Sequence, residues 1–195
     1  MTFPKVIRGK AWKFGANIDT DQIIPAKYAI YSFDEKKLGE HALEGVPDNE
    51  GWAERVSDGD ILVAGSNFGC GSSREIAPVA IRGAGISCVI ADSYARIFFR
   101  NSINVGLPIV ECREIVDVTE EGDEIEVDLA TGTVRNLTKG ITASAVPFPD
   151  FMRHIIEAGG LVPYLHEKLT SDPSGSNGNT DGVRAEGEEV DLRHD

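Results

Sequence analysis

The chain has 195 residues, enough for one substantial hydrophobic core, and its 32 acidic and 19 basic residues give a net charge of −13. Nucleic acids and anionic membrane surfaces attract basic patches, so this charge argues against both as partners. A membrane-spanning helix is not expected either, because the sequence has no apolar run of about 18 residues.

From the N-terminus we expect a strand at 6–14, loops at 15–21 and 23–31, a helix at 35–43 and a buried strand at 61–64. A glycine-rich turn then leads into a helix, followed by a buried strand at 87–91. Next come a helix that Ser93 caps and that reaches 101, and a short strand at 108–112. Alternating apolar and polar residues predict strands at 115–118, 124–129 and 133–137, with a hairpin turn at Thr131-Gly132. A final helix is expected at 150–158.

This order of elements predicts a layered α/β domain with a late antiparallel hairpin. We expect one globular domain over 1–169. The remaining residues are rich in Ser, Gly, Asn and Asp and show no periodicity. They predict an acidic, disordered tail over 170–195.

Three cysteines, Cys70, Cys88 and Cys112, are odd in number and widely spaced along the chain. This pattern is typical of reduced thiols and not of a disulfide framework. No Cys-x-x-Cys pair occurs, so we expect this chain itself to bind neither an iron–sulfur cluster nor another metal. The first residues lack the apolar core of a signal peptide, so we expect a cytoplasmic protein.

The most informative stretch follows the strand at 61–64 and reads Gly65-Ser66-Asn67-Phe68-Gly69-Cys70-Gly71-Ser72-Ser73-Arg74-Glu75. Its three glycines allow positive φ angles and a close approach of the backbone to a ligand. Two hydroxyls and a guanidinium follow, where free backbone N–H groups and a helix dipole favour an anion. The stretch therefore predicts a cradle for a carboxylate or a phosphate, with a possible proton-transfer group inside it.

Other readings of this stretch are weaker. It lacks the Gly-Lys of a phosphate loop, the third glycine of a dinucleotide fingerprint and the Gly-x-Ser-x-Gly of a serine-hydrolase elbow. Ser72 and Glu75 also fit a capping box, in which the two side chains cap a helix start. A capping box explains neither the three glycines nor Ser73 and Arg74, and it can coexist with anion binding at one helix end.

Residues 69–75 resemble the swivelling domain of the aconitase superfamily, and within it the small subunits of 3-isopropylmalate dehydratase and of homoaconitase-type enzymes. Segments 17–25, 83–91 and 93–101 resemble the same family in the same order, and the resemblance runs from about 5 to about 169. It implies a three-layer β/β/α swivelling fold. One departure is Ile76, where many relatives have a histidine; we expect this residue to tune the site without abolishing it.

The resemblance also implies a function. Such small subunits belong to heteromeric hydro-lyases that isomerise 2-isopropylmalate and 3-isopropylmalate by dehydration and rehydration in leucine biosynthesis. Their chemistry uses a [4Fe–4S] cluster, which we expect on a larger partner subunit in a heterodimer or heterotetramer. The ligand would be a small hydroxy-dicarboxylic or hydroxy-tricarboxylic acid.

By the same resemblance, Ser72 matches the family's catalytic serine, which acts as an alkoxide base, and Asp21 matches its active-site aspartate. Ser73 and Arg74 match the contacts to the substrate carboxylate, which suits arginine because its planar fork pairs two oxygens. The backbone of the cradle would come from Gly69, Cys70 and Gly71.

The loop at 26–32 matches the segment that meets the variable group of the substrate, and Tyr28 and Ile30 are its candidate contacts. Homoaconitase-like loops tend to have an arginine where this chain has Ile30, which suits an isopropyl group better than a further carboxylate. A homoaconitase or a 2,3-dimethylmalate dehydratase remains an alternative, as does a non-enzymatic module that binds an organic acid. An enzyme acting on a phosphate ligand is disfavoured.

Four residues have alternative interpretations. Asp19 and Asp21 could share a proton or a metal, although an Asx-turn is the more common role of such a pair. Cys70 could be a nucleophile or a redox sensor, but a small packing residue is favoured. His41 shares no metal-ligand spacing with other histidines, which favours a structural or surface role.

Overall fold

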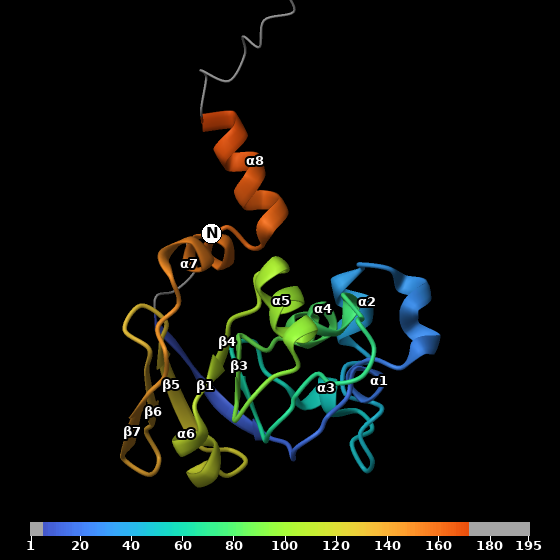
Figure 1. The fold of residues 1–195 in the computed structure, drawn as a ribbon. Coiled ribbons are helices and arrows are strands. Elements are labelled where there is room, and N and C mark those ends of the chain that lie inside the picture. The colour runs from blue at the N-terminus through green and yellow to red at the C-terminus, as the bar shows by residue number, and fades with distance from the viewer. Residues whose placement is uncertain (1–5, 172–195) are drawn as a thin grey trace, which may run out of the picture.

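A computed structural model describes residues 6–171 (Figure 1). Its centre is a seven-stranded sheet with the order β4-β3-β2-β1-β5-β6-β7. The strands are β1 (Val6–Lys13), β2 (Ile61–Ala64), β3 (Cys88–Ala91), β4 (Ile109–Glu111), β5 (Glu124–Asp128), β6 (Thr133–Asn136) and β7 (Ile141–Ser144).

Strand β1 belongs to both halves of this sheet. Its second half pairs in parallel with β2, with Ala11 opposite Ile61. Its first half pairs antiparallel with β5, with Val6 opposite Asp128. The strands β1 to β4 therefore form a parallel half and β5 to β7 an antiparallel half, and β1 is where the sheet turns from one to the other.

The sheet curls so that its two halves enclose one of two hydrophobic cores. Residues alternate in direction along β2: Ile61 and Val63 belong to the core shared with β5 and β6, whereas Leu62 and Ala64 face the helices. The result is three layers, which are the antiparallel strands, the parallel strands and the helices α4 and α5 (Figure 1). This arrangement confirms the expected β/β/α fold.

The helices are α1 (Thr20–Ile23), α2 (Glu35–Gly39), α3 (Trp52–Arg55), α4 (Ile76–Gly83), α5 (Arg96–Asn104), α6 (Arg113–Val118), α7 (Asp150–Glu157) and α8 (Leu161–Ser171), with a 3₁₀ helix, η1 (Ala26–Tyr31). Among the described residues, none of these helices is long and apolar enough to cross a membrane. Helix α8 extends away from the body of the molecule (Figure 1).

Several sequence predictions are wrong. Most of the loop predicted at 23–31 forms the 3₁₀ helix η1. The segment predicted as a strand at 115–118 lies in helix α6, where the adjacent residues Ile115 and Val116 are both buried in the core between the sheet halves. Ser93 does not cap a helix, because α5 begins at Arg96 and its N-cap is Ala95. Instead, the Ser93 hydroxyl accepts a hydrogen bond from the backbone N–H of Asn67 at 2.9 Å.

The C-terminal part also differs from the expectation. Helix α8 follows Gly159-Gly160 directly and was not predicted from the sequence. It reaches Ser171, two residues into the segment expected as a tail. The rest of that segment, residues 172–195, lies outside the described residues.

Candidate active site

The glycine-rich turn begins where β2 ends and leads into α4, so it lies at the carboxyl edge of the parallel strands. Gly69 and Gly71 have φ angles of +76° and +89°, which favour glycine. Gly69 also has no room for a side chain, because an added Cβ would lie 2.1 Å from a ring carbon of Phe98 on α5. The ring of Phe98 thus packs directly against the backbone of the turn.

The loop that precedes α1 runs beside this turn and is bonded to it along its length. Four backbone hydrogen bonds join them: Gly65 N to Gly15 O (3.0 Å), Asn17 N to Ser66 O (2.8 Å), Gly69 N to Ile18 O (2.8 Å) and Thr20 N to Cys70 O (2.8 Å). The Thr20 hydroxyl adds a bond to the carbonyl of Ser72 at 3.0 Å. Both segments carry predicted site residues, and these bonds hold them in register.

Arg74 connects the turn with α1. Its Nη2 lies 2.6 Å from Oδ1 of Asp21, and its Nη1 donates to the carbonyl of Ile24 at 2.9 Å. The Arg74 side chain is mostly covered, whereas that of Asp21 is 58% exposed. The structure therefore brings together two predicted site residues that are far apart in the sequence, and it leaves the carboxylate open to solvent.

Asp19 has a different role from Asp21. Its side chain accepts a hydrogen bond from the backbone N–H of Gln22 at 2.8 Å, and the Gln22 side chain accepts one from the Asp19 N–H at 3.0 Å. This is a capping box at the start of α1. Asp19 thus fulfils the local turn role that was the alternative to a shared metal or proton.

Ser72 and Ser73 are exposed, and their hydroxyls form no hydrogen bond within the described residues. The backbone N–H groups of Gly71, Ser72 and Ser73 likewise donate to no acceptor in this part of the chain. Consecutive free N–H groups at the entrance to a helix, with two hydroxyls and a guanidinium beside them, can bind an anion.

The capping box expected from Ser72 and Glu75 is not formed. Helix α4 begins at Ile76, its N-cap is Glu75, and no side chain caps it. The Arg74 N–H bonds to the Ser72 carbonyl at 2.8 Å, so a tight turn separates Ser72 from the helix. This displacement is why both serine hydroxyls remain unpaired.

Tyr28 and Ile30 lie on η1, which follows α1. The Tyr28 hydroxyl donates a hydrogen bond to Glu44, and its ring stacks on His41. Ile30 is 79% exposed and makes no core contact. The structure gives Tyr28 partners within the chain and leaves Ile30 free to meet another molecule.

The cysteines do not form a site for a cluster. Cys70 is half-buried in the glycine-rich turn, whereas Cys88 and Cys112 are buried in the core between the sheet halves. Burial raises the pKa of the Cys88 thiol well above its usual value. Among residues 6–171, no group of three or more His, Cys, Asp or Glu side chains is placed to hold a metal ion. The residues present therefore do not fit an iron–sulfur cluster.

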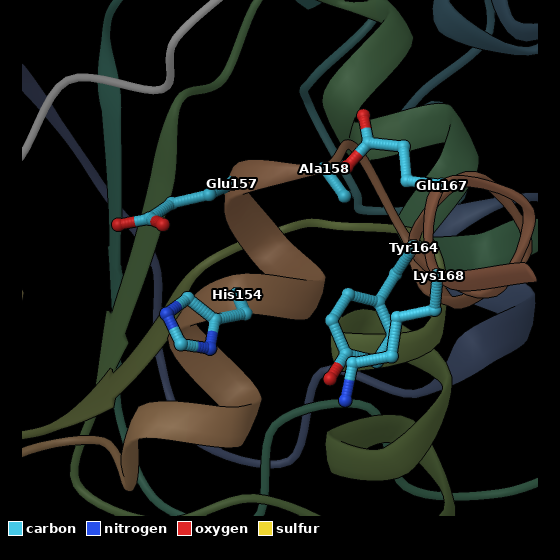
Figure 2. Close-up of a pocket in the computed structure, with 6 residues that line it drawn as sticks. All are labelled: His154, Glu157, Ala158, Tyr164, Glu167 and Lys168. Carbon is cyan, nitrogen blue, oxygen red and sulfur yellow. The ribbon is translucent and has the colours of Figure 1, made fainter. Parts of the chain in front are cut away.

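A pocket between α7 and α8 lies outside the predicted site. Figure 2 shows His154 and Glu157 on α7, and Tyr164, Glu167 and Lys168 on α8. None of the residues that carry the resemblance lines it. Within the cradle, residues 71–73 are by contrast exposed at the surface.

Comparisons with known proteins identify the family of this chain. Residues 17–114 match the family model described as the aconitase C-terminal domain. The 3-isopropylmalate dehydratase small subunit of Caldicellulosiruptor bescii is 56% identical over 167 residues, which cover 86% of this chain and 99% of that protein. The chain belongs to the family of 3-isopropylmalate dehydratase small subunits.

Two further members of this family come from Methanocaldococcus jannaschii. The isopropylmalate/citramalate isomerase small subunit is 53% identical, over 84% of this chain and 96% of that protein. The crystal structure of 3-isopropylmalate dehydratase (leuD) has a TM-score of 0.77 and 42% identity, over 85% of this chain and 96% of that chain. Family membership and fold are therefore both as the sequence motifs predicted.

One pair of residues beside the cradle, Asn17 and Asn67, was not predicted from the sequence. Asn17 and Asn67 both have φ angles of +59°, and the Asn67 side-chain amide donates to that of Asn17 at 3.0 Å. Asparagine tolerates this left-handed conformation better than most residues, and this preference is the one sign of the pair in the sequence. Their contact across 50 residues could not be read from it.

Proposed function

We propose that this chain is the small subunit of a heteromeric hydro-lyase that interconverts 2-isopropylmalate and 3-isopropylmalate in leucine biosynthesis. The observation that carries the proposal is the open cradle, with its free N–H groups at 71–73, the unpaired hydroxyls of Ser72 and Ser73, and Arg74 beside them. It occurs in a chain whose relatives are named for this reaction.

The reaction removes a proton from a carbon next to a carboxylate and a hydroxyl group from the adjacent carbon. Water then adds back with the two positions exchanged, which gives the isomer. Ser72 is the proposed base: its oxygen takes the proton as an alkoxide. A serine is too weak an acid to ionise unaided, and the free N–H groups, the start of α4 and the Arg74 guanidinium would stabilise the charge.

Arg74 is the proposed carboxylate ligand, together with Ser73. Its guanidinium is held at fixed positions by Asp21 and the Ile24 carbonyl, so little side-chain freedom remains to be lost when the substrate binds. Asp21 would thereby orient the arginine, and its exposed carboxylate could itself reach a substrate hydroxyl. Both roles depend on α1 lying against the turn.

The proposed partner is a large subunit that carries a [4Fe–4S] cluster. Two observations support this. Residues 6–171 offer no group of side chains placed to hold a metal ion, and the serines of the cradle are exposed although an alkoxide base requires a water-excluded site. A surface on another subunit would close the cradle. The three unpaired cysteines suit the reducing cytoplasm, where we place the complex.

The proposed substrate carries an apolar side group, because the apolar side chain of Ile30 on η1 is exposed and free to meet it. Citramalate, which carries a methyl group in place of the isopropyl group, is a second candidate substrate, since one relative is named for both acids. A homocitrate-type acid would bring a further carboxylate next to Ile30 without a partner.

Replacing Ser72 tests the proposed base. In the assembled enzyme we expect Ser72→Ala to lower kcat for 2-isopropylmalate by about 10²- to 10⁴-fold, the range for loss of a general base, with the subunits still associated. Ser66→Ala is the matched control, because Ser66 lies in the same turn and its hydroxyl forms no hydrogen bond. Equal turnover by the Ser72 and Ser66 variants would show that Ser72 is not the base.

A further inference from the structure

Helix η1 is attached to the cradle at one end, and its tyrosines Tyr28 and Tyr31 pack against the core. It starts directly after Ile24 and Pro25, and the Ile24 carbonyl accepts the hydrogen bond from Arg74 at 2.9 Å. None of its residues is buried, and no side chain caps its start. In Figure 1 it lies in the blue segment next to α2, at the edge of the molecule.

Of these two tyrosines, Tyr28 lies closer to His41, since Tyr31 stacks on the same histidine with 5.9 Å between the ring centroids. The Tyr28 ring stacks on His41 with 3.8 Å between the centroids and 5° between the planes. One carboxylate joins the pair: Glu44 accepts the Tyr28 hydroxyl on one oxygen and lies 2.8 Å from Nδ1 of His41 with the other. Because the Tyr28 ring is stacked on His41 and its hydroxyl is bonded to Glu44, both the position and the orientation of the ring are fixed.

The pKa shifts of Glu44 and Tyr28 are consistent with these hydrogen bonds. Burial raises the pKa of Glu44, but the hydrogen bonds from Tyr28 and His41 outweigh burial and lower it overall. The hydrogen bond to Glu44 raises the pKa of Tyr28. An ionised Glu44 only accepts, so Tyr28 and His41 Nδ1 must both donate, and this determines the histidine tautomer.

The segment that carries His41 and Glu44 is itself bonded to α1. The Leu43 N–H donates to the Ile23 carbonyl at 2.7 Å, and the Gly45 N–H donates to the Gln22 carbonyl at 3.1 Å. Helix α1 is in turn bonded to the cradle through Thr20. A continuous set of contacts therefore runs from the cradle through α1 and residues 41–45 to Tyr28 on η1.

We propose that His41 and Glu44 are positioning residues that hold η1 at a defined distance from the cradle, and that they thereby set which side group of the substrate is accepted. The inference rests on the proposed function, in which Ile30 on η1 meets that group. Neither His41 nor Glu44 need touch the substrate, because both act through Tyr28. Loosening η1 should weaken contact with a large side group and leave a small one nearly unaffected.

The test compares two substrates that differ in this group alone. Glu44→Gln keeps the size of the side chain but removes its charge, and Tyr28→Phe keeps the ring but removes the hydroxyl. For each variant, assembled with the large subunit, kcat/KM is measured for 2-isopropylmalate and for citramalate. We expect the ratio of the two values to fall about five- to tenfold, within the range of one ordinary hydrogen bond, mainly through KM for 2-isopropylmalate.

Controls separate positioning from general damage. Glu40→Gln is the matched variant, since Glu40 lies just before His41 and its exposed side chain has no partner within residues 6–171; its ratio should equal that of the wild type. The double variant Glu44→Gln/Tyr28→Phe should lower the ratio no further than the worse single variant, because both changes act on the same contact between Tyr28 and Glu44.

An unchanged ratio in both single variants would overturn the inference, and so would an equal fall in kcat/KM for both substrates. If Glu44→Gln does not fold, Tyr28→Phe alone decides between these outcomes. A wild-type complex that turns over neither acid would refute the proposed function, a result distinct from the failure of the positioning role.

Discussion

At the scale of single residues, the site depends on backbone that only certain side chains allow. Gly69 combines a positive φ angle with direct contact to Phe98, so the glycine is required both by conformation and by space. The sequence predicted these glycines as part of a cradle, because they are contiguous with Ser72 and Arg74. It could not predict that Phe98 on another helix makes Gly69 irreplaceable.

Gly69→Ala should lower the free energy of unfolding by about 2 to 4 kcal/mol, since it adds left-handed strain to an overpacked contact. Denaturant titration of the isolated chain measures this. Gly15→Ala is the control, because Gly15 does not have a positive φ angle and an added Cβ there would meet nothing within 4 Å. Equal stability of the two variants would contradict the steric role assigned to Phe98.

At the scale of elements, local pattern predicted the strands of the parallel half and failed where packing decides. The alternation at 115–118 is typical of a strand, yet Ile115 and Val116 both face the core from helix α6. Helix α8 was missed because Gly159-Gly160 indicates a stop and Pro163 follows soon after. Proline is tolerated there, because the first N–H groups of a helix have no acceptor within it.

Arg82 on α4 connects this helix with two other helices of the helical layer. Its Nε and Nη2 donate to both oxygens of Glu35 on α2, at 2.6 and 2.7 Å, and its Nη1 donates to the Val105 carbonyl at the end of α5. Because this one side chain joins three helices, Arg82→Ala should lower the free energy of unfolding by about 2 kcal/mol.

Denaturant titration measures this change, and Arg8→Ala is the control variant. Arg8 pairs with Glu124 at 3.0 Å, but both side chains are about half exposed, so this variant should unfold close to the wild type. If the Arg82 variant were as stable as the Arg8 variant, the layer of α2, α4 and α5 would not depend on this contact.

At the scale of the whole molecule, α1 is the element that links predicted site residues. Arg74 in the cradle and Asp21 on α1 lie far apart in the sequence, and the bonds between α1 and the cradle bring them together. Contiguous motifs made the chemistry and the family predictable from the sequence. The contacts between segments, such as Arg74 with Asp21 and Tyr28 with Glu44, came only from the structure, because they depend on how the chain folds back on itself.

The most direct test of the central claim is turnover by the two subunits mixed under anaerobic conditions. This chain, a cluster-loaded large subunit and their mixture are each given 2-isopropylmalate, and the unsaturated acid is followed by its absorbance. We predict turnover by the mixture and none by either subunit alone. Turnover by the large subunit alone at the rate of the mixture, or a stable complex without turnover, would contradict the claim that this chain supplies the base.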